Sequence, residues 1–408
     1  MAVRASPDSH SISSPYYLAF IRSLLKFNSL WDRLRLVRLL HLADLHLGAK
    51  FKWLGEKSAT RKEDLSEAFK RAIDFAVDEK NKIDAVLFAG DTFDSHKPSN
   101  ETTELFRAQL DRLKKGKIHS ILIPGNHDAY EYSDSLWREE FDWLHLLGEP
   151  EVGAPLTLLI NSEECHFYGF AFDSRKSNEP FDEFKTTGSE GFHIALIHGS
   201  LGVGDHIEMH SRSVPLNRKR LVKTGMNYIA LGHYHNFDEI NEGGVTVVYP
   251  GTLEGMGFGE DGERWLVVAE LSQKGVKIRK EKINKRTLLS ETIDLSDSSD
   301  ATSTVRDRLK ELSDDNTLLK LELTGSAEST VDVDSLLKAY EEQFFLLKIV
   351  DNLSLLDSKR IEILRSEVSV RGNFVDSLLN GLEKLDDRER SLRELALRKG
   401  LAHLGGID

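Results

Sequence analysis

Short apolar runs alternate with helical patterns in the first part of the chain. Leu39–Ala43, Ala85–Ala89 and Ser120–Ile123 are short, mostly apolar runs of the kind that forms buried strands. Between them, Leu65–Val77 and Thr102–Leu113 carry apolar residues at helical spacing. This alternation predicts parallel strands joined by crossover helices.

From Leu156 onward the pattern changes to strands with few helices between them. The expected strands are Leu156–Ile160, Cys165–Phe170, His193–Ile197, Tyr228–Leu231, Val245–Tyr249, Trp265–Leu271 and Val276–Lys282. A second run of strands predicts a second sheet packed on the first. The sequence therefore predicts an α/β fold, a two-sheet sandwich flanked by helices.

A polar segment, Leu295–Ser303, predicts a domain boundary. Beyond it we expect helices at Val305–Leu312, Asp334–Phe345, Phe374–Leu385 and Arg388–Leu404, and strands at Thr317–Leu323 and Leu346–Val350. We therefore expect three parts: an N-terminal extension (1–36), a main domain (37–290) and a small C-terminal α+β domain that ends in helices (291–408).

The N-terminal extension differs in charge from the rest of the chain. Its cations are Arg4, Arg22, Lys26, Arg33 and Arg35, against only Asp8 and Asp32. Three interpretations stay open: a targeting segment, a disordered extension, or a start assigned too early, with Val37 as the true beginning.

Composition narrows the class of protein. The formal net charge of −13 argues against a protein that coats nucleic acid by electrostatics alone, although it does not exclude a nuclease. No apolar run approaches the roughly 18 residues that span a bilayer. The single cysteine, Cys165, excludes an intramolecular disulfide framework and a multi-cysteine metal site. We therefore expect a cytoplasmic protein without a membrane span.

Metal-ligating residue types follow five of the expected strands. In chain order they are Asp44 and His46, then Asp91, then Asn126 with His127 and Asp128, then His198, then His233 and His235. Ligands of open α/β sheets gather outside the carboxyl ends of strands. Carboxylates, an amide oxygen and imidazoles suit Mn, Fe or Zn better than Ca. A lone histidine is more often structural, but the ordered set predicts a metal site, and paired metals about 3.5–4 Å apart suit attack on phosphorus.

This ordered series resembles the calcineurin-like metallophosphoesterase superfamily. More narrowly, residues 40–48 (LHLADLHLG) resemble the SbcD/YhaO-like DNA double-strand-break repair exonucleases. So do residues 90–94 (GDTFD), 228–235 (YIALGHYH) and 249–252 (YPGT). The resemblance covers about Val37–Arg286. The C-terminal part is similar to the capping domain of that family in pattern only.

The resemblance implies two divalent metal ions, which we expect to be Mn²⁺. One ion would be held by Asp44, His46, Asp91 and His235, and the other by Asp91, Asn126, His198 and His233. A metal-bound hydroxide would be the nucleophile. His127 would stabilise the developing charge and help the 3′ oxygen to leave, and Asp128 could orient the His127 ring.

One position departs from the family pattern. Some members carry a second catalytic histidine three residues after the bridging aspartate, where this chain has Asp94. An ionised carboxylate cannot act as a cationic phosphate ligand, although it can orient a water or a metal ligand. The balance between exonuclease and endonuclease activity therefore stays open.

The sequence thus favours a Mn-dependent DNA repair nuclease, a 3′–5′ exonuclease with endonuclease activity left open. Two alternatives remain: a small-molecule phosphodiesterase or phosphatase with the same site, and a catalytically silent repair subunit. The resemblance implies an SMC-like coiled-coil ATPase partner and a homodimer through the helices Leu65–Val77 and Thr102–Leu113. A basic stretch is either a rim for the DNA backbone or a solvated loop; it contains Arg212, Arg218, Lys219, Arg220 and Lys223.

Overall fold

The computed structural model describes residues 36–404, with gaps at 176–183, 185, 187, 189, 203–212, 297, 299, 326–330, 354–357, 382–384, 387, 391, 394, 395, 398, 399 and 401–403. Apart from its last residue, the N-terminal extension therefore lies outside the described residues, and the helix expected at Arg388–Leu404 lies partly outside them. The chain divides into two compact units. The first comprises the described residues up to Glu254 together with Glu263–Asn284, and the second comprises Gly255–Gly262 together with the described residues from Lys285 onward.

The first unit contains two sheets. The six-stranded sheet has the order β13 (Gly275–Lys282), β12 (Trp265–Ser272), β1 (Val37–Leu42), β2 (Ala85–Ala89), β3 (His119–Ile123) and β4 (His145–Leu146). The other sheet runs β10 (Asp238–Glu242), β11 (Val245–Tyr249), β9 (Tyr228–Gly232), β7 (Phe192–Leu201), β6 (Glu163–Phe170) and β5 (Leu156–Ile160), and β8 (Val214–Leu216) pairs with β7. The predicted two-sheet sandwich is confirmed.

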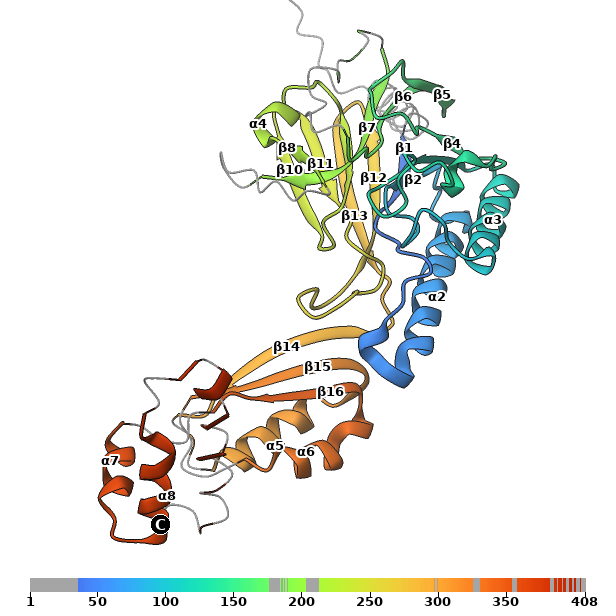
Figure 1. Cartoon of the computed structure of the whole chain (residues 1–408). Coiled ribbons are helices and arrows are strands. Elements are labelled where there is room, and N and C mark those ends of the chain that lie inside the picture. Colours follow the sequence, from blue (N-terminus) through green and yellow to red (C-terminus); the bar gives the residue numbers. More distant parts are fainter. Residues whose placement is uncertain are drawn as a thin grey trace, which may run out of the picture. The chain divides into compact units, whose positions relative to one another are not determined.

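Apolar side chains on alternate faces of the strands build this sandwich. On β1, Leu39 packs in the core between the two sheets, while Leu40 and Leu42 pack toward the helices. The helices on that side are α2 (Ser58–Val77) and α3 (Asn100–Lys115), which cover one face of the first sheet (Figure 1). Shorter helical segments are η1 (Lys52–Lys57), η2 (Leu136–Arg138) and α4 (Arg218–Leu221). Because both faces of the central strands are buried, those strands are mostly apolar.

Parallel pairing brings the site residues to one edge. β1, β2 and β3 pair in parallel, so the turns that follow them, with Asp44, Asp91 and Asn126, lie at the same end of the sheet. In the second sheet β7 and β9 are also parallel, and His198 is opposite Gly232 in the register. The prediction that this strand ends at Ile197, with His198 directly after it, is wrong. β7 continues to Leu201, because β8 pairs with Gly199–Leu201.

The second unit has a parallel three-stranded sheet, β14 (Thr287–Asp294), β15 (Asp314–Thr324) and β16 (Phe344–Asp351). Helices α5 (Ala301–Glu311) and α6 (Val333–Tyr340) cover one face of it, followed by the short η4 (Glu341–Gln343) (Figure 1). The chain then forms α7 (Ser358–Ser366) and α8 (Val370–Leu379), which share a small apolar cluster around Leu364 and Val375. β14 was not predicted, because Glu291 stands between Leu289 and Ile293 and interrupts the apolar alternation.

None of the helices in the described part of the chain combines the length and the apolar character that a membrane span requires.

Candidate metal centre

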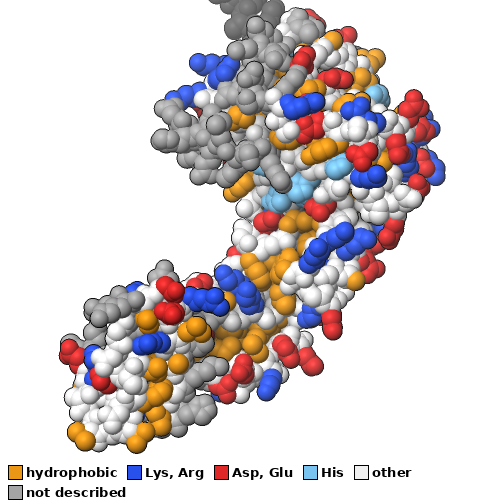
Figure 2. Space-filling model, viewed as in Figure 1, with side chains coloured by type: hydrophobic (Ala, Val, Ile, Leu, Met, Phe, Trp, Pro, Cys, Tyr) orange, Lys and Arg blue, Asp and Glu red, His pale blue; other side chains and the backbone are white. Residues whose placement is uncertain are grey.

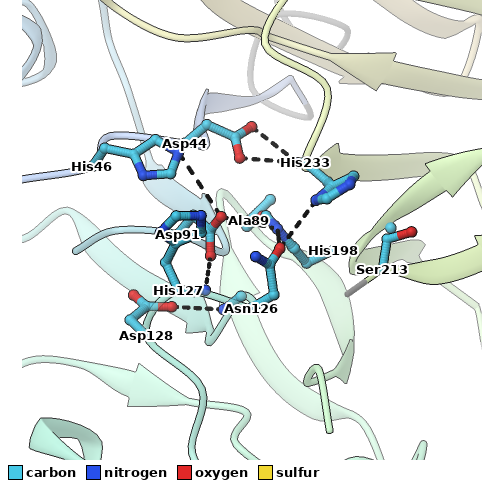
Figure 3. A network of polar contacts seen from close by, with 12 residues as sticks. Asp44, His46, Ala89, Asp91, Asn126, His127, Asp128, His198, Ser213 and His233 are labelled. Carbon is cyan, nitrogen blue, oxygen red and sulfur yellow. Dashed lines mark hydrogen bonds and ion pairs between the residues drawn. The ribbon is translucent and has the colours of Figure 1, made fainter. Parts of the chain in front are cut away.

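Two candidate ligands lie in a tight turn after β1. The strand ends at Leu42, and Asp44 and His46 adopt left-handed backbone conformations, with φ of 51° and 45°. Both residues therefore lie in a turn beyond the strand and do not continue it. Instead the Asp44 amide donates to the carbonyl of Gly90 (3.1 Å), and the His46 amide donates to that of Asp91 (3.0 Å). These bonds tie the turn to the loop after β2 and bring both side chains beside Asp91 (Figure 3).

Asp91 lies between two groups of ligand-type side chains. Its Oδ1 accepts a hydrogen bond from the backbone amide of His127 (2.8 Å). Its Oδ2 is 3.4 Å from Nε2 of His198 and 3.9 Å from Nε2 of His46. The residue is buried and takes a positive φ of 50°. This placement suits a carboxylate shared by two cations.

The first group consists of Asp44, His46 and His235. Ligand atoms of these three residues lie within 4.8 Å of one another. The Nε2 atoms of His46 and His235 are 3.2 Å apart. The Asp44 carboxylate also accepts the backbone amide of His233 at 3.0 Å on both oxygens, which joins this group to the other.

The second group consists of Asn126, His198 and His233. The Asn126 Oδ1 is 3.0 Å from Nε2 of His198 and 3.0 Å from Nδ1 of His233. The fully buried His198 ring donates from Nδ1 to the carbonyl of Ala89 (3.0 Å). This bond fixes the ring and directs Nε2 toward Asn126 and Asp91.

Glycines allow the close approach on which both groups depend. A Cβ on Gly125 would lie 2.2 Å from Asp91 Oδ1, and one on Gly232 would lie 2.0 Å from the Ala89 carbonyl oxygen and 2.8 Å from His198 Nδ1. A side chain at either position would therefore displace the site.

His127 lies at the edge of the centre and is half-exposed. A ring nitrogen of His127 belongs to a cluster with His46 and Asp91 whose ligand atoms lie within 4.8 Å of one another. Its Nδ1 is 3.4 Å from the carbonyl oxygen of Asp94 and 3.7 Å from Asp94 Oδ1. The same Oδ1 is 3.3 Å from Nδ1 of His46. Asp94 therefore faces both a candidate ligand and the His127 ring.

The structure does not have the expected hydrogen bond between Asp128 and the His127 ring. Asp128 is buried, and its carboxylate accepts the backbone amides of Gly125 (2.7 Å) and Phe93 (3.1 Å). It therefore braces the two loops that carry Asn126 and Asp94. Burial, with the nearby Asp91 charge, raises the pKa of Asp128 to about 7.

The charges of the centre are strongly coupled. Burial opposes the protonated form of His46, yet the carboxylates of Asp94 and Asp91 raise its pKa to about 9. Burial likewise opposes protonation of His198, while Asp91 and Asp44 raise its pKa to about 9. By contrast, burial and the His198 charge lower the pKa of His233 to about 3. Carboxylates thus draw positive charge into an interior that would otherwise exclude it.

The donor set fits divalent metal ions. In each group, nitrogen and oxygen atoms that carry lone pairs face one another at about hydrogen-bond distance, an arrangement that needs a proton or a cation between them. The mixture of carboxylate, imidazole and amide oxygen suits Mn, Fe or Zn. Figure 2 shows histidine side chains gathered at the surface of the first unit, and the half-exposed His127 brings one edge of the centre to the surface.

One supporting residue was not predicted from the sequence. The carbonyl of His235 accepts the Thr252 amide (3.0 Å) and Nη1 of the buried Arg264 (2.8 Å), which also bonds to Asn236 Oδ1 (2.8 Å). Arg264 thus holds the loop that carries His235. The contact is to a backbone atom, which no side-chain motif encodes.

Comparison with known proteins also points to a metal-dependent phosphoesterase site. The family model for calcineurin-like phosphoesterases matches residues 37–237. The uncharacterized metallophosphoesterase YhaO of Bacillus subtilis is 28% identical over 232 residues, which is 55% of this chain and 55% of its own length. The DNA double-strand break repair protein Mre11 of Methanosarcina mazei is 26% identical over 330 residues, 77% of this chain and 48% of its own.

The Mre11 protein of Sulfolobus acidocaldarius is 23% identical over 378 residues, 88% of this chain and 94% of its own. This chain spans about half the length of YhaO and of the Methanosarcina protein. The span that the family model matches contains every candidate ligand from Asp44 to His235. Residues 37–237 of this chain are a calcineurin-like phosphoesterase domain.

Proposed function

We propose that this protein is a Mn²⁺-dependent nuclease that hydrolyses DNA phosphodiester bonds from 3′ ends. The observation that carries the proposal is the convergence of six ligand-type side chains around a seventh, Asp91. The relatives named as DNA double-strand break repair proteins support DNA as the substrate. Endonuclease cutting is a further possibility that the same site chemistry allows.

Two ions would be held by residues that the structure brings together. Asp44, His46 and His235 would bind one, Asn126, His198 and His233 the other, and Asp91 both. Such ions supply Lewis-acid polarisation of the phosphate and lower the pKa of water. Mn²⁺ accepts this mixed nitrogen and oxygen set readily.

His127 would act on the leaving group. Its Nδ1 is oriented by Asp94, which leaves Nε2 for the substrate. A protonated His127 can donate a hydrogen bond to a phosphate oxygen and then give its proton to the departing 3′ oxygen. The product would be a nucleotide with a 5′ phosphate.

Partners would supplement the weak attraction of an acidic chain for DNA. The net charge of −13 predicts salt-sensitive binding by the chain alone. Family resemblance implies an SMC-like coiled-coil ATPase, and the exposed apolar Ile363, Val368 and Val370 around α7 and α8 offer a surface for it. The same resemblance implies a homodimer through α2 and α3.

The test uses end-labelled single-stranded and duplex DNA with Mn²⁺, Mg²⁺ or a chelator. We expect cutting with Mn²⁺, none with the chelator, and a loss of about 100-fold or more in His127→Ala with metal content unchanged. His96→Ala is the matched control, because His96 is also a partly exposed histidine, paired with Asp134 at 3.5 Å outside the centre. Wild-type turnover in His127→Ala would overturn the role given to that residue.

A small phosphodiester, bis(p-nitrophenyl) phosphate, runs in parallel. Its turnover together with intact DNA, with or without co-purified partner proteins, would favour the alternative of a small-molecule phosphodiesterase.

A further inference from the structure

A pocket of about 480 Å³ opens beside the metal centre on the second sheet. Its volume is in the range of small-molecule sites, about 300–1000 Å³. The residues that line it include Ser200, Asn217, Lys219, Tyr234, Asp238 and Tyr249. None of these residues is among the candidate metal ligands.

The chain itself places this pocket next to the metal centre. Tyr234 stands between His233 and His235 in the sequence, so its Cα is about 3.8 Å from the Cα of each. Ser200 follows His198 by two residues on β7. A group in this pocket is therefore within one nucleotide's reach of a phosphate held by those histidines.

Tyr234 offers an exposed aromatic surface on a rigid support. Its side chain is 51% exposed, and its ring meets that of Tyr249 edge to face, with centroids 5.7 Å apart. The Tyr249 hydroxyl donates to the carbonyl of Gly199 (2.6 Å) and accepts the Leu201 amide (3.1 Å). These two hydrogen bonds fix the position of Tyr249, so the Tyr234 ring packs against an immobile neighbour. An exposed ring held in this way suits base stacking.

The polar groups around the ring suit a nucleotide. Arg218 is paired with Glu242 at 3.0 Å, and no carboxylate of the described residues pairs with the exposed Lys219. Lys219 is thus available to a phosphate oxygen. Asn217 and Asp238 present an amide and a carboxylate, which form hydrogen bonds with the edges of bases. Of the basic stretch noted in the sequence, Arg212 lies outside the described residues.

We infer that this pocket binds the nucleoside attached to the phosphate at the metal centre, with its base stacked on Tyr234. The inference rests on the proposed function only in that the substrate is a nucleotide. Because any base has an aromatic face, the pocket would accept all four bases. It would select nucleotide phosphodiesters over phosphates without a base.

The test compares two ligands that share the sugar phosphate, 2′-deoxyadenosine 5′-monophosphate and 2-deoxyribose 5-phosphate. They differ at C1′, where one carries adenine and the other a hydroxyl. Calorimetry is done with Mn²⁺ on the full chain carrying His127→Ala, so that neither ligand turns over. We expect the nucleotide to bind about 5- to 150-fold more tightly than the sugar phosphate. Tyr234→Ala should abolish that difference, and Tyr234→Phe should keep it.

The matched control is Tyr132→Ala, which removes another exposed tyrosine, one that stacks on His96. It should leave the preference intact. Two results would overturn the inference. One is equal affinity of the two ligands for protein that retains Tyr234. The other is a Tyr234→Phe variant that binds the nucleotide as weakly as Tyr234→Ala does. Tyr234 variants are compared at matched Mn²⁺ content, measured by elemental analysis.

DNA hydrolysis by the unmodified chain is measured separately. A base preference without DNA hydrolysis would keep the pocket and refute the nuclease. DNA hydrolysis without a base preference would support the nuclease and refute the nucleoside pocket.

Discussion

The two groups of ligands in the metal centre are supported in different ways. In the second group, His198 is fully buried and its Nδ1 is held by the backbone carbonyl of Ala89. In the first group, His46 is oriented by the side chain of Asp94, which is about one-third exposed. The loop of His235 is held through the His235 carbonyl, by the Thr252 amide and Arg264.

This difference separates a histidine ring oriented by a backbone carbonyl from one oriented by a replaceable side chain. Backbone contacts to His198 depend on the packing of two sheets and on glycines with no room for a Cβ. The side chains around His46 and His235 can change without moving a strand. We therefore expect changes that touch the second group to be more severe than changes around the first.

Asp91→Asn should have the largest effect, because Asp91 serves both groups. The amide removes the shared negative charge and should cost both ions, with a loss of hydrolysis of about 1000-fold or more. Metal content by elemental analysis and DNA hydrolysis measure this. Two tightly bound ions in the variant would contradict the bridging role.

Gly232→Ala should break the second group through the backbone. The new Cβ would lie 2.0 Å from the Ala89 carbonyl oxygen, which must then release His198. We expect about 100-fold weaker Mn²⁺ binding and a loss of about 1–3 kcal/mol in the free energy of unfolding. Gly153→Ala is the control, because nothing lies within 4 Å of its Cβ. Equal behaviour of the two variants would refute the distinction drawn here.

Asp94→Asn should weaken the first group more mildly. The amide keeps the shape but removes the charge that faces His46 and His127. Residues that orient metal ligands typically change affinity or activity by about 10- to 100-fold. We expect a fall of that size in turnover, with the second ion retained. Loss of both ions would show that the groups are not separable.

His41 is buried as deeply as His198, but its Nδ1 is hydrogen-bonded to the Tyr228 hydroxyl (2.8 Å) and not to a carboxylate. Burial lowers the pKa of His41 to about 3, with partial opposition from a backbone hydrogen bond. The unfolded chain, with an ordinary pKa near 6.5, therefore takes up a proton first as the pH falls. Stability is present above about pH 6.5 and is lost from there toward pH 3.

At pH 5 this loss should be on the order of 2 kcal/mol relative to pH 7. Urea unfolding at both pH values should show a smaller decrease in His41→Asn than in the unsubstituted chain. Equal decreases would mean that His41 does not titrate as described.

Arg264→Met should have the smallest effect on the centre. The loop loses the Arg264 bonds to the His235 carbonyl and to Asn236 Oδ1, but the His235 carbonyl keeps the Thr252 amide. We expect about 10-fold weaker binding of one ion by calorimetry. An unchanged Mn²⁺ affinity would show that Arg264 does not position His235.

The ligands of both groups could be predicted equally well from the sequence, because they all stand next to apolar runs that form strands. Asp44, His46, Asp91 and Asn126 could be predicted to meet, since parallel strands share an edge. The left-handed turn at Asp44 and His46 could not be, because it depends on bonds to the loop after β2.

Contacts made through backbone atoms explain the remaining differences. Asp128 was expected to orient His127, but its oxygens are used by the amides of Gly125 and Phe93. Asp94 was recognised as a possible orienting residue, although its contact with two rings depends on the fold. The exposed strand β10 (Asp238–Glu242) was missed because its polar sequence has no buried face.

The central claim is that two groups of side chains share Asp91 and bind two ions. Equilibrium dialysis against Mn²⁺, followed by elemental analysis of the unsubstituted chain, tests it most directly. We expect two ions per chain. One ion per chain, or none at a saturating concentration, would contradict it.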